Sequence, residues 1–413
     1  PMPAPDTLLV ASLVVPMTRP PIRSGGVLVR DGRIVDVDSA ARLARARPHA
    51  RQIDLGRSML LPGLINAHTH LELTGIARGV DRPGCFTDWI SALGQSLNRT
   101  APDFSERVTA ATRAGVTQSI SHGVTTVGDI SQQMHLTRPI LRGGPLSVVS
   151  FGEALGLARI RHRFEAGLQR ALDLSDESSS LRCGVSPHAP YTVDEPGLRA
   201  CVAAAEQARR SICIHRAETR EETDFTTSHT GSFRALWDRL GTWSDDAPLP
   251  GCAPIELAER TGLLRAGALL AHVNYCTDAE LDLLAHRAAA VGFCPRTHAY
   301  FDHPPHRWRG ILARGNNVCI GHATSPDLDP LDDLRLLARQ APATSPASLL
   351  ELITVRAARA MHVSDRGQLA PGRRADFAIF PRDGSDPPAT LLHEPLPCTS
   401  TWIAGVQRYQ FAG

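Results

Sequence analysis

Lysine is absent from this chain of 413 residues, and all 44 of its basic residues are arginines. This absence excludes a Schiff-base lysine, the lysine of a phosphate-binding P-loop and a carboxylated lysine that bridges two metal ions. The 42 acidic residues nearly balance the arginines, so the formal net charge is only +2. Such a balance gives no reason to expect a nucleic acid or an anionic membrane as a partner.

Long apolar runs and paired cysteines are also missing. No segment approaches the roughly 20 apolar residues of a membrane-spanning helix. Asp6, Pro16 and Pro20 interrupt the N-terminal stretch, which therefore lacks the apolar segment of a signal peptide. The nine cysteines include no Cys-x-x-Cys pair. Several lie in apolar, strand-like runs: Cys183, Cys213, Cys294 and Cys319. We interpret them as small buried hydrophobes in a reducing compartment and expect a cytoplasmic protein.

The middle of the chain alternates apolar, strand-like runs with helical stretches rich in alanine and leucine. Eight such runs begin near Leu60, Val124, Leu146, Leu181, Ile212, Leu269, Ala289 and Val318. Eight strand–helix units over roughly 300 residues predict an α/β fold of the (β/α)8 or TIM-barrel type. An open doubly wound sheet is the alternative, but no glycine-rich dinucleotide loop supports it.

Both ends of the chain are rich in short strands and turns. Residues 26–37 predict two strands around an Asp31-Gly32 turn, and residues 377–380 predict another strand. We expect residues 58–365 to form the barrel and residues 1–57 and 366–413 to form a smaller strand-rich unit. Residues 221–254 predict a long, mixed loop.

Histidines stand where several of the apolar runs end. Barrel active sites lie at the carboxyl ends of the strands. His68 and His70 follow the run Met59–Ala67, and residues two positions apart share a face of a strand. With His215 they could form a three-nitrogen metal site that leaves one position open for water. A metal there would lower the pKa of that water.

Two further residues at the strand ends suggest proton chemistry. Glu218 follows His215 by three positions and could carry a proton between the water and a leaving group. His272 ends the sixth run and could hydrogen-bond the water or a developing oxyanion. Taken singly, each of these histidines also fits a structural role, and Glu218 also fits a carboxylate at a helix N-terminus.

Several motifs together resemble one family. They are Leu61-Pro62-Gly63 before the two histidines, Pro187-His188-Ala189-Pro190-Tyr191, His215-x-x-Glu218 and Pro371-Gly372-Arg373-Arg374-Ala375-Asp376. The chain resembles the metal-dependent amidohydrolase superfamily over nearly all its length. It is most similar to the cyclic deaminase and chlorohydrolase subgroup, which includes S-adenosylhomocysteine, methylthioadenosine, guanine and aminofutalosine deaminases and triazine chlorohydrolases.

The resemblance implies a small β-sandwich built from both termini, one divalent metal and a homodimer. The metal is usually Zn2+ and sometimes Fe2+. The missing lysine agrees with a single ion, since the fourth run ends in His188 instead. The resemblance makes His188 a substrate contact and implies a small N-heterocyclic substrate, such as an adenine-type nucleoside. Trp89 lies in a segment that resembles a substrate loop and could stack on a planar ring, or it could be a core residue.

One position departs from the family. The resembling proteins end strand eight with an aspartate two residues after a glycine, and this aspartate binds the metal and accepts a proton. In this chain Ala323 takes that place after Gly321. Alanine can neither bind a metal nor accept a proton.

Three explanations of the missing aspartate remain open. The protein is an impaired enzyme, which we favour, or a shorter loop brings Asp327 or His322 into the vacant place. Alternatively, three histidines and water hold the metal while Glu218 carries all proton transfers. Asp327 and Asp329 also fit caps of a helix that starts near Leu331.

The preferred hypothesis is a mononuclear metal-dependent hydrolase that deaminates an N-heterocycle. Loss of chloride or an amine from a triazine is an alternative within the same metal chemistry. The alternative that is not an enzyme is a non-catalytic metal-binding protein on the same scaffold, and Ala323 favours it.

Overall fold

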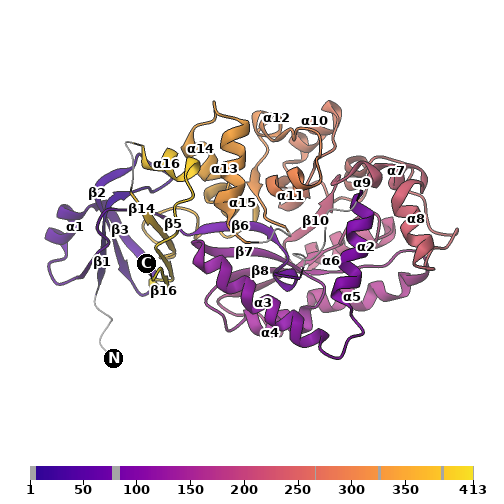
Figure 1. The fold of residues 1–413 in the computed structure, drawn as a ribbon, viewed down its shortest axis with the longest axis horizontal. Helices are drawn as coiled ribbons and strands as arrows, with labels where there is room; N and C mark the ends of the chain where they lie inside the picture. Colours follow the sequence, from indigo (N-terminus) through magenta and orange to yellow (C-terminus); the bar gives the residue numbers. More distant parts are fainter. Residues whose placement is uncertain (1–5, 77–83, 266, 324–326, 383–385, 413) are drawn as a thin grey trace.

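The computed structural model describes residues 6–76, 84–265, 267–323, 327–382 and 386–412. Two sheets of eight strands each organise these residues. One sheet is parallel and curls into a barrel, and the other is a mixed sheet at one end of the molecule (Figure 1). Among the described residues, no helix combines the length and apolar content needed to cross a bilayer.

The parallel sheet is a nearly closed barrel whose strands follow one another in chain order. Its strands are β6 (Leu64–Thr69), β7 (Val124–Ser131), β8 (Ser147–Glu153), β9 (Leu181–Ser186), β10 (Ile212–Arg216), β11 (Ala268–His272), β12 (Ala290–Phe293) and β13 (Val318–Ile320). Beyond β13, the His322 N–H donates to the carbonyl of His68 over 2.8 Å, which joins the last strand to the first. The predicted TIM-type barrel is confirmed.

Helices connect the strands and cover the outside of the barrel. In Figure 1, α3, α4 and α5 lie along its lower side, and α10, α12, α13 and α14 lie along its upper side. The helices from α2 to α9 are α2 (Phe86–Leu97), α3 (Phe104–Ser121), α4 (Met134–Leu141), α5 (Phe164–Leu172), α6 (Glu195–Gln207), α7 (Arg220–Ser228), α8 (Gly231–Arg239) and α9 (Pro254–Arg260). The later ones are α10 (Asp278–Arg287), α11 (Pro295–Tyr300), α12 (Trp308–Ala313), α13 (Pro330–Gln340), α14 (Pro346–Glu351) and α15 (Val355–Ala360). Two short 3-10 helices, η1 (Leu71–Leu73) and η3 (Ala158–Arg163), follow β6 and β8.

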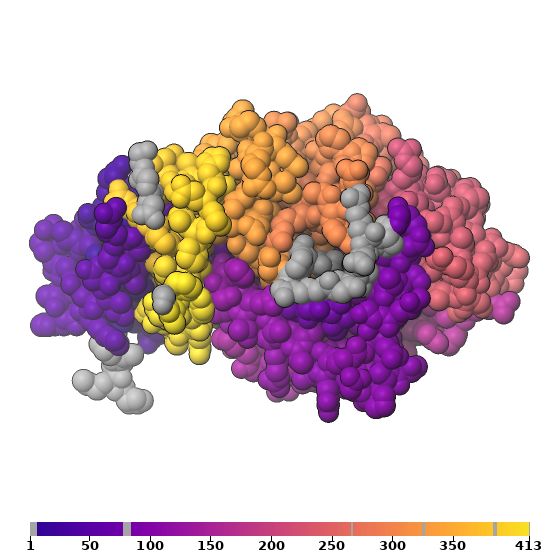
Figure 2. Space-filling view, in the orientation of Figure 1, coloured from indigo at the N-terminus to yellow at the C-terminus, as the bar shows by residue number. Residues whose placement is uncertain are grey.

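The second sheet is built from both ends of the chain. The N-terminal part supplies β1 (Thr7–Val14), β2 (Ile22–Arg30), β3 (Arg33–Ser39), β4 (Arg51–Asp54) and β5 (Ser58–Pro62), with α1 (Ala40–Ala46). The C-terminal part supplies β14 (Phe377–Pro381), β15 (Ser400–Ile403) and β16 (Val406–Gln410), with α16 (Pro387–His393). Strand β5 pairs with both β1 and β14, so it joins the two parts. In Figure 2 the yellow C-terminal residues lie between the indigo N-terminal part and the barrel.

The structure corrects two details of the sequence interpretation. The apolar run near Leu60 is not one barrel strand, because it splits at Gly63 into β5 of the mixed sheet and β6 of the barrel. A Cβ at Gly63 would lie 2.2 Å from Thr125 Oγ1 and 2.8 Å from Thr125 Cβ, so the chain can pass between the sheets only without a side chain there. The predicted loop 221–254 instead contains α8 and most of α7.

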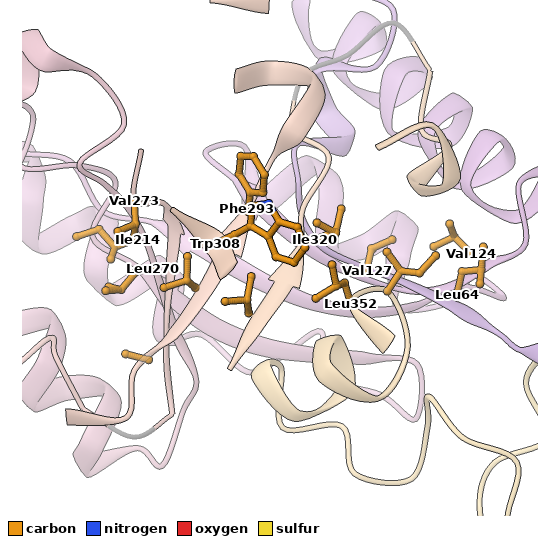
Figure 3. Packing of buried hydrophobic residues seen from close by; sticks show 14 of the residues in the cluster. Leu64, Val124, Val127, Ile214, Leu270, Val273, Phe293, Trp308, Ile320 and Leu352 are labelled. Carbon is orange, nitrogen blue, oxygen red and sulfur yellow. The ribbon is translucent and has the colours of Figure 1, made fainter. Parts of the chain in front are cut away.

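The core fills the space between the barrel strands and the surrounding helices. Side chains of β6, β7, β10, β11, β12 and β13 pack with Trp308 of α12 and with Leu352, which follows α14 (Figure 3). All these residues are almost completely buried. Burial on this scale fixes the strand ends in place, and the candidate site lies at those ends.

We predict that Gly63→Ala destabilises the fold by about 1–3 kcal/mol, because the added methyl group overlaps the side chain of Thr125. Gly94→Ala, at an exposed position in α2 with no atom within 4 Å of a built Cβ, is the matched control and leaves stability unchanged or slightly higher. Denaturant unfolding followed by circular dichroism measures both. Equal stability of the two variants would contradict the close approach at Gly63.

Candidate metal centre and active site

Three histidines from two strands of the barrel converge at its carboxyl end. A ring nitrogen from each of His68, His70 and His215 lies within 4.8 Å of the other two. The Nε2 atoms of His70 and His215 are 3.3 Å apart. His68 Nε2 is buried and has no hydrogen-bond partner among the residues that the structure describes. The predicted metal ligands are therefore close enough to share one ion.

Hydrogen bonds orient two of these rings toward the centre of the cluster. The Nδ1 of His215 donates to the carbonyl of His188 over 2.9 Å, which leaves its Nε2 as the free electron-pair donor. The ring of His70 meets that of His215 through their Nε2 atoms. Burial lowers the pKa of His68 and His70 well below the usual value, and neighbouring imidazoles lower it further. Burial likewise lowers the pKa of His215 to about 4. All three rings are neutral at pH 7, which is the form that binds metals.

Glu218 and His272 lie together beside this cluster. Glu218 Oε1 is 3.3 Å from His272 Nε2, and both side chains are buried. The ring of His272 lies 5.4 Å from that of His68 and 5.7 Å from that of His215, between ring centres. Burial raises the pKa of Glu218 well above its usual value, and the neighbouring Glu222 raises it further. Burial therefore favours the protonated form of the Glu218 carboxyl group.

The loop that carries Glu218 is held by an acidic residue that the sequence interpretation missed. Glu222 in α7 accepts hydrogen bonds from the backbone N–H groups of Ala217 and Glu218, both over 2.8 Å. Burial raises the pKa of Glu222 to about 7. Thr219-x-x-Glu222 matches the pattern of a helix N-terminus, and Thr219 caps α7 by accepting from the Glu222 N–H. That pattern marks the start of the helix but does not predict that Glu222 holds the loop of Glu218.

Unusual backbone conformations place these side chains. Ala217, His272 and Val273 have φ values of 50°, 73° and 54°. Positive φ is a strained conformation for a β-branched valine, and such strain concentrates at functional sites. Two hydrogen bonds between the strand ends hold the strained segment, from the Val273 N–H to the Arg216 carbonyl and from the Asn274 N–H to the Ala217 carbonyl, each over 2.9 Å.

A second missed carboxylate, Glu153, lies on the other side of His215. A carboxylate oxygen of Glu153, at the end of β8, lies within 4.8 Å of ring nitrogens of both His188 and His215. Burial raises the pKa of Glu153, and burial lowers the pKa of His188 to about 4. The sequence could have indicated Glu153, because it lies at the carboxyl end of a strand, and the same position identified the histidines.

His188 and Trp89 occupy different surroundings. His188 Nδ1 is 2.7 Å from Thr192 Oγ1, and its ring lies 5.0 Å from that of His215, so it adjoins the cluster. Trp89 lies in α2 and packs against Phe86 and Phe301, with ring centres 6.0 and 5.5 Å away. Its side chain belongs to an aromatic cluster and is 8% exposed. A role for either residue in substrate binding stays a prediction.

Neither candidate for the vacant aspartate position reaches the histidine cluster. His322 points to Asp333 and to the Asp327 carbonyl, with which its two ring nitrogens are hydrogen-bonded. The Asp327 carboxylate pairs with Arg296 over 2.7 Å. The suggestion that one of them replaces the aspartate is therefore wrong for the part of the chain that the structure describes; residues 324–326 lie outside it. Asp329 caps α13, as expected, by accepting from the Leu331 N–H over 2.9 Å.

The donor set fits a divalent metal ion. Three neutral imidazoles with a buried, unpartnered nitrogen are the ligands of known catalytic zinc sites with an open fourth position. Leaving such a nitrogen buried without a partner is costly, and an ion would remove that cost.

Comparison with known proteins agrees with the fold and shows the family. The sequence model of the amidohydrolase family matches residues 59–407. The chain is 28% identical over 407 residues to a 5-methylthioadenosine/S-adenosylhomocysteine deaminase of Nitratidesulfovibrio vulgaris, covering 94% of this chain and 87% of that protein.

Two solved structures share the fold. One is a zinc-bound adenosine deaminase from Xanthomonas campestris, with a TM-score of 0.85 and 22% identity over 99% of this chain and 94% of that chain. The other is a zinc complex of atrazine chlorohydrolase from Arthrobacter aurescens, with a TM-score of 0.81 and 20% identity over 98% of this chain and 95% of that chain.

We predict that the purified protein binds one Zn2+ and that His70→Ala weakens this binding. The loss should exceed the roughly 10- to 100-fold typical of removing a residue that only orients a ligand. His286→Ala, on the exposed side of α10, is the control and keeps the affinity of the unaltered protein. Competition with a chromophoric chelator measures both, and equal affinity of the two variants would exclude the cluster as the binding site.

Proposed function

We propose, because this chain belongs to the amidohydrolase family, that it is a mononuclear metal-dependent hydrolase that deaminates an N-heterocycle. The observation that carries the proposal is the grouping of His68, His70 and His215 beside the 3.3 Å pair of Glu218 and His272. This arrangement unites a site for one ion with a protonated carboxyl group and a neutral imidazole, which are the groups that hydrolytic removal of ammonia requires.

The proposed substrate is an adenine-type nucleoside. A curated relative over 94% of this chain is named as a deaminase of 5-methylthioadenosine and S-adenosylhomocysteine, both of which carry an adenine ring. Hydrolysis would add the oxygen of water to the ring carbon that carries the amino group, and that group would leave as ammonia. We propose that His188 contacts the ring and that Trp89 lines the side from which it enters.

Each group has one role in this scheme. The three imidazoles would hold a divalent ion, Zn2+ or Fe2+, whose Lewis acidity would activate water for attack. Burial raises the pKa of Glu218, so it would enter the reaction as an acid and donate its proton to a ring nitrogen as the amino-bearing carbon becomes tetrahedral. The carboxylate so formed would take one proton from the attacking oxygen and pass it to the amino group, which leaves as ammonia. It would recover its own proton from the same oxygen as the carbonyl forms. His272 would hydrogen-bond the attacking oxygen, since its Nε2 faces both Glu218 and the cluster.

Ala323 supports a second candidate, a non-catalytic metal-binding protein. The position carries a methyl group that is 5% exposed, so no carboxylate at that position can accept the proton of the attacking water. In the catalytic proposal Glu218 must carry every proton transfer. Hydrolysis of a triazine remains the alternative reaction, and parallel assays with an adenine nucleoside and a chlorotriazine distinguish the two substrates.

We predict that Glu218→Gln lowers kcat for the adenine nucleoside by about 10²- to 10⁴-fold, because the amide cannot donate and recover a proton. Zinc binding should stay within about twofold of the unaltered protein, since Glu218 is outside the three-histidine group. Glu221→Gln, three residues along the chain in the first turn of α7, is the matched control and keeps full activity. Ammonia release measures kcat, and similar rates for both variants would remove Glu218 from the reaction.

We predict that Ala323→Asp raises both metal occupancy and turnover, the latter by at least about tenfold, because a carboxylate there can accept a proton. Ala323→Asn, which is similar in size but is not a base, is the control and should not raise turnover. Metal analysis and ammonia release follow the two effects. If the aspartate changes neither quantity, the assignment of position 323 or the enzyme proposal is wrong.

A further inference from the structure

A cysteine lies where the vacant ligand position meets the histidine cluster. Cys294 directly follows β12 and is buried. Its Sγ, a ring nitrogen of His68 and a ring nitrogen of His272 all lie within 4.8 Å of one another. His68 therefore belongs both to this group and to the group with His70 and His215.

The chain is built to bring Cys294 close to His68. A Cβ at Gly321 would lie 2.6 Å from His68 Cβ and 3.0 Å from Cys294 Sγ, so the approach requires a residue without a side chain. The hydrogen bond that the sulfur donates is long, 4.0 Å to the Gly292 carbonyl, so the thiol is not held firmly by the backbone. Gly321, which permits the close approach, precedes Ala323 by two residues.

A second observation points to a ligand at this place. His68 Nε2 is buried and has no partner. An apolar cysteine in a core would not by itself indicate a site. Here the thiol lies within 4.8 Å of a ring nitrogen of His68, the histidine whose Nε2 has no partner among the described residues.

We propose that Cys294 supplies a thiolate ligand to the ion held by His68, in place of the aspartate that Ala323 lacks. The inference rests on the proposed metal site. Mixed histidine and cysteine ligand sets are ordinary for zinc, with a Zn–S bond of about 2.3 Å. On binding, the S–H bond is lost, the sulfur shares an electron pair with the ion and the proton passes to solvent. The thiolate replaces the missing negative charge but not the carboxylate's second oxygen.

Substitution of Co2+ gives a readout that is independent of activity. Apoprotein prepared with a chelator and kept reduced with a phosphine is titrated with Co2+. A bound thiolate produces a near-ultraviolet charge-transfer band that imidazole ligands do not produce. We expect this band in the unaltered protein, with one equivalent of Co2+ bound, and its loss in both Cys294→Ala and Cys294→Ser. Each variant should bind Co2+ at least about tenfold more weakly.

Cys213 provides the matched control. Its Sγ lies 3.8 Å from His68 Nδ1, so it is also a buried thiol in contact with a proposed ligand histidine. Cys213→Ala should keep the band. The double variant Cys294→Ala with Ala323→Asp should regain Co2+ affinity but not the band, because a carboxylate then restores the charge.

Each other outcome is decisive. Co2+ binding to the unaltered protein without a thiolate band overturns the role of Cys294 and leaves the proposed function intact. A band that persists in Cys294→Ser also overturns the role of Cys294, because the band then belongs to another cysteine. Failure of the unaltered protein to bind Co2+ or Zn2+ overturns both proposals. The spectrum of the unaltered protein is informative even if a variant does not fold.

Discussion

A buried imidazole nitrogen without a partner is the constraint around which this site is organised. His68 Nε2 lies at the end of β6, removed from water and without a hydrogen bond. An unsatisfied buried polar group costs about 1–3 kcal/mol. Packing of the barrel strands holds the ring there, while His70 and His215 present their own nitrogens to the same space. A bound cation would offset this cost. Without a cation, the hydrophobic core of the barrel must compensate for it.

The charges around the cluster follow from the same burial. Desolvation lowers the pKa of the histidines and raises the pKa of Glu218, Glu222 and Glu153, so each group prefers its neutral form. A site made of neutral imidazoles can accept a divalent cation without opposing positive charge. The same burial favours the acid form of Glu218, three residues from a metal-ligand candidate. Burial therefore causes both the shifted pKa values and the neutral histidines that a metal ion needs.

The sequence predicted the barrel because buried parallel strands are continuous apolar runs. Seven of the eight predicted starts lie within about a residue or two of the start of a barrel strand. The split of the first run at Gly63 was not predictable, because it depends on the approach of Thr125 from β7. The histidines were predictable, because a strand end places them. Glu222 and Cys294 were not, since their roles come from contacts between elements distant in sequence.

The most direct measurement is anomalous diffraction at the zinc edge from crystals of the protein grown with Zn2+. The account predicts one strong peak at the carboxyl end of the barrel, at about 2.0–2.1 Å from nitrogens of His68, His70 and His215. A crystal saturated with zinc that shows density for all three rings and no peak among them would contradict the account.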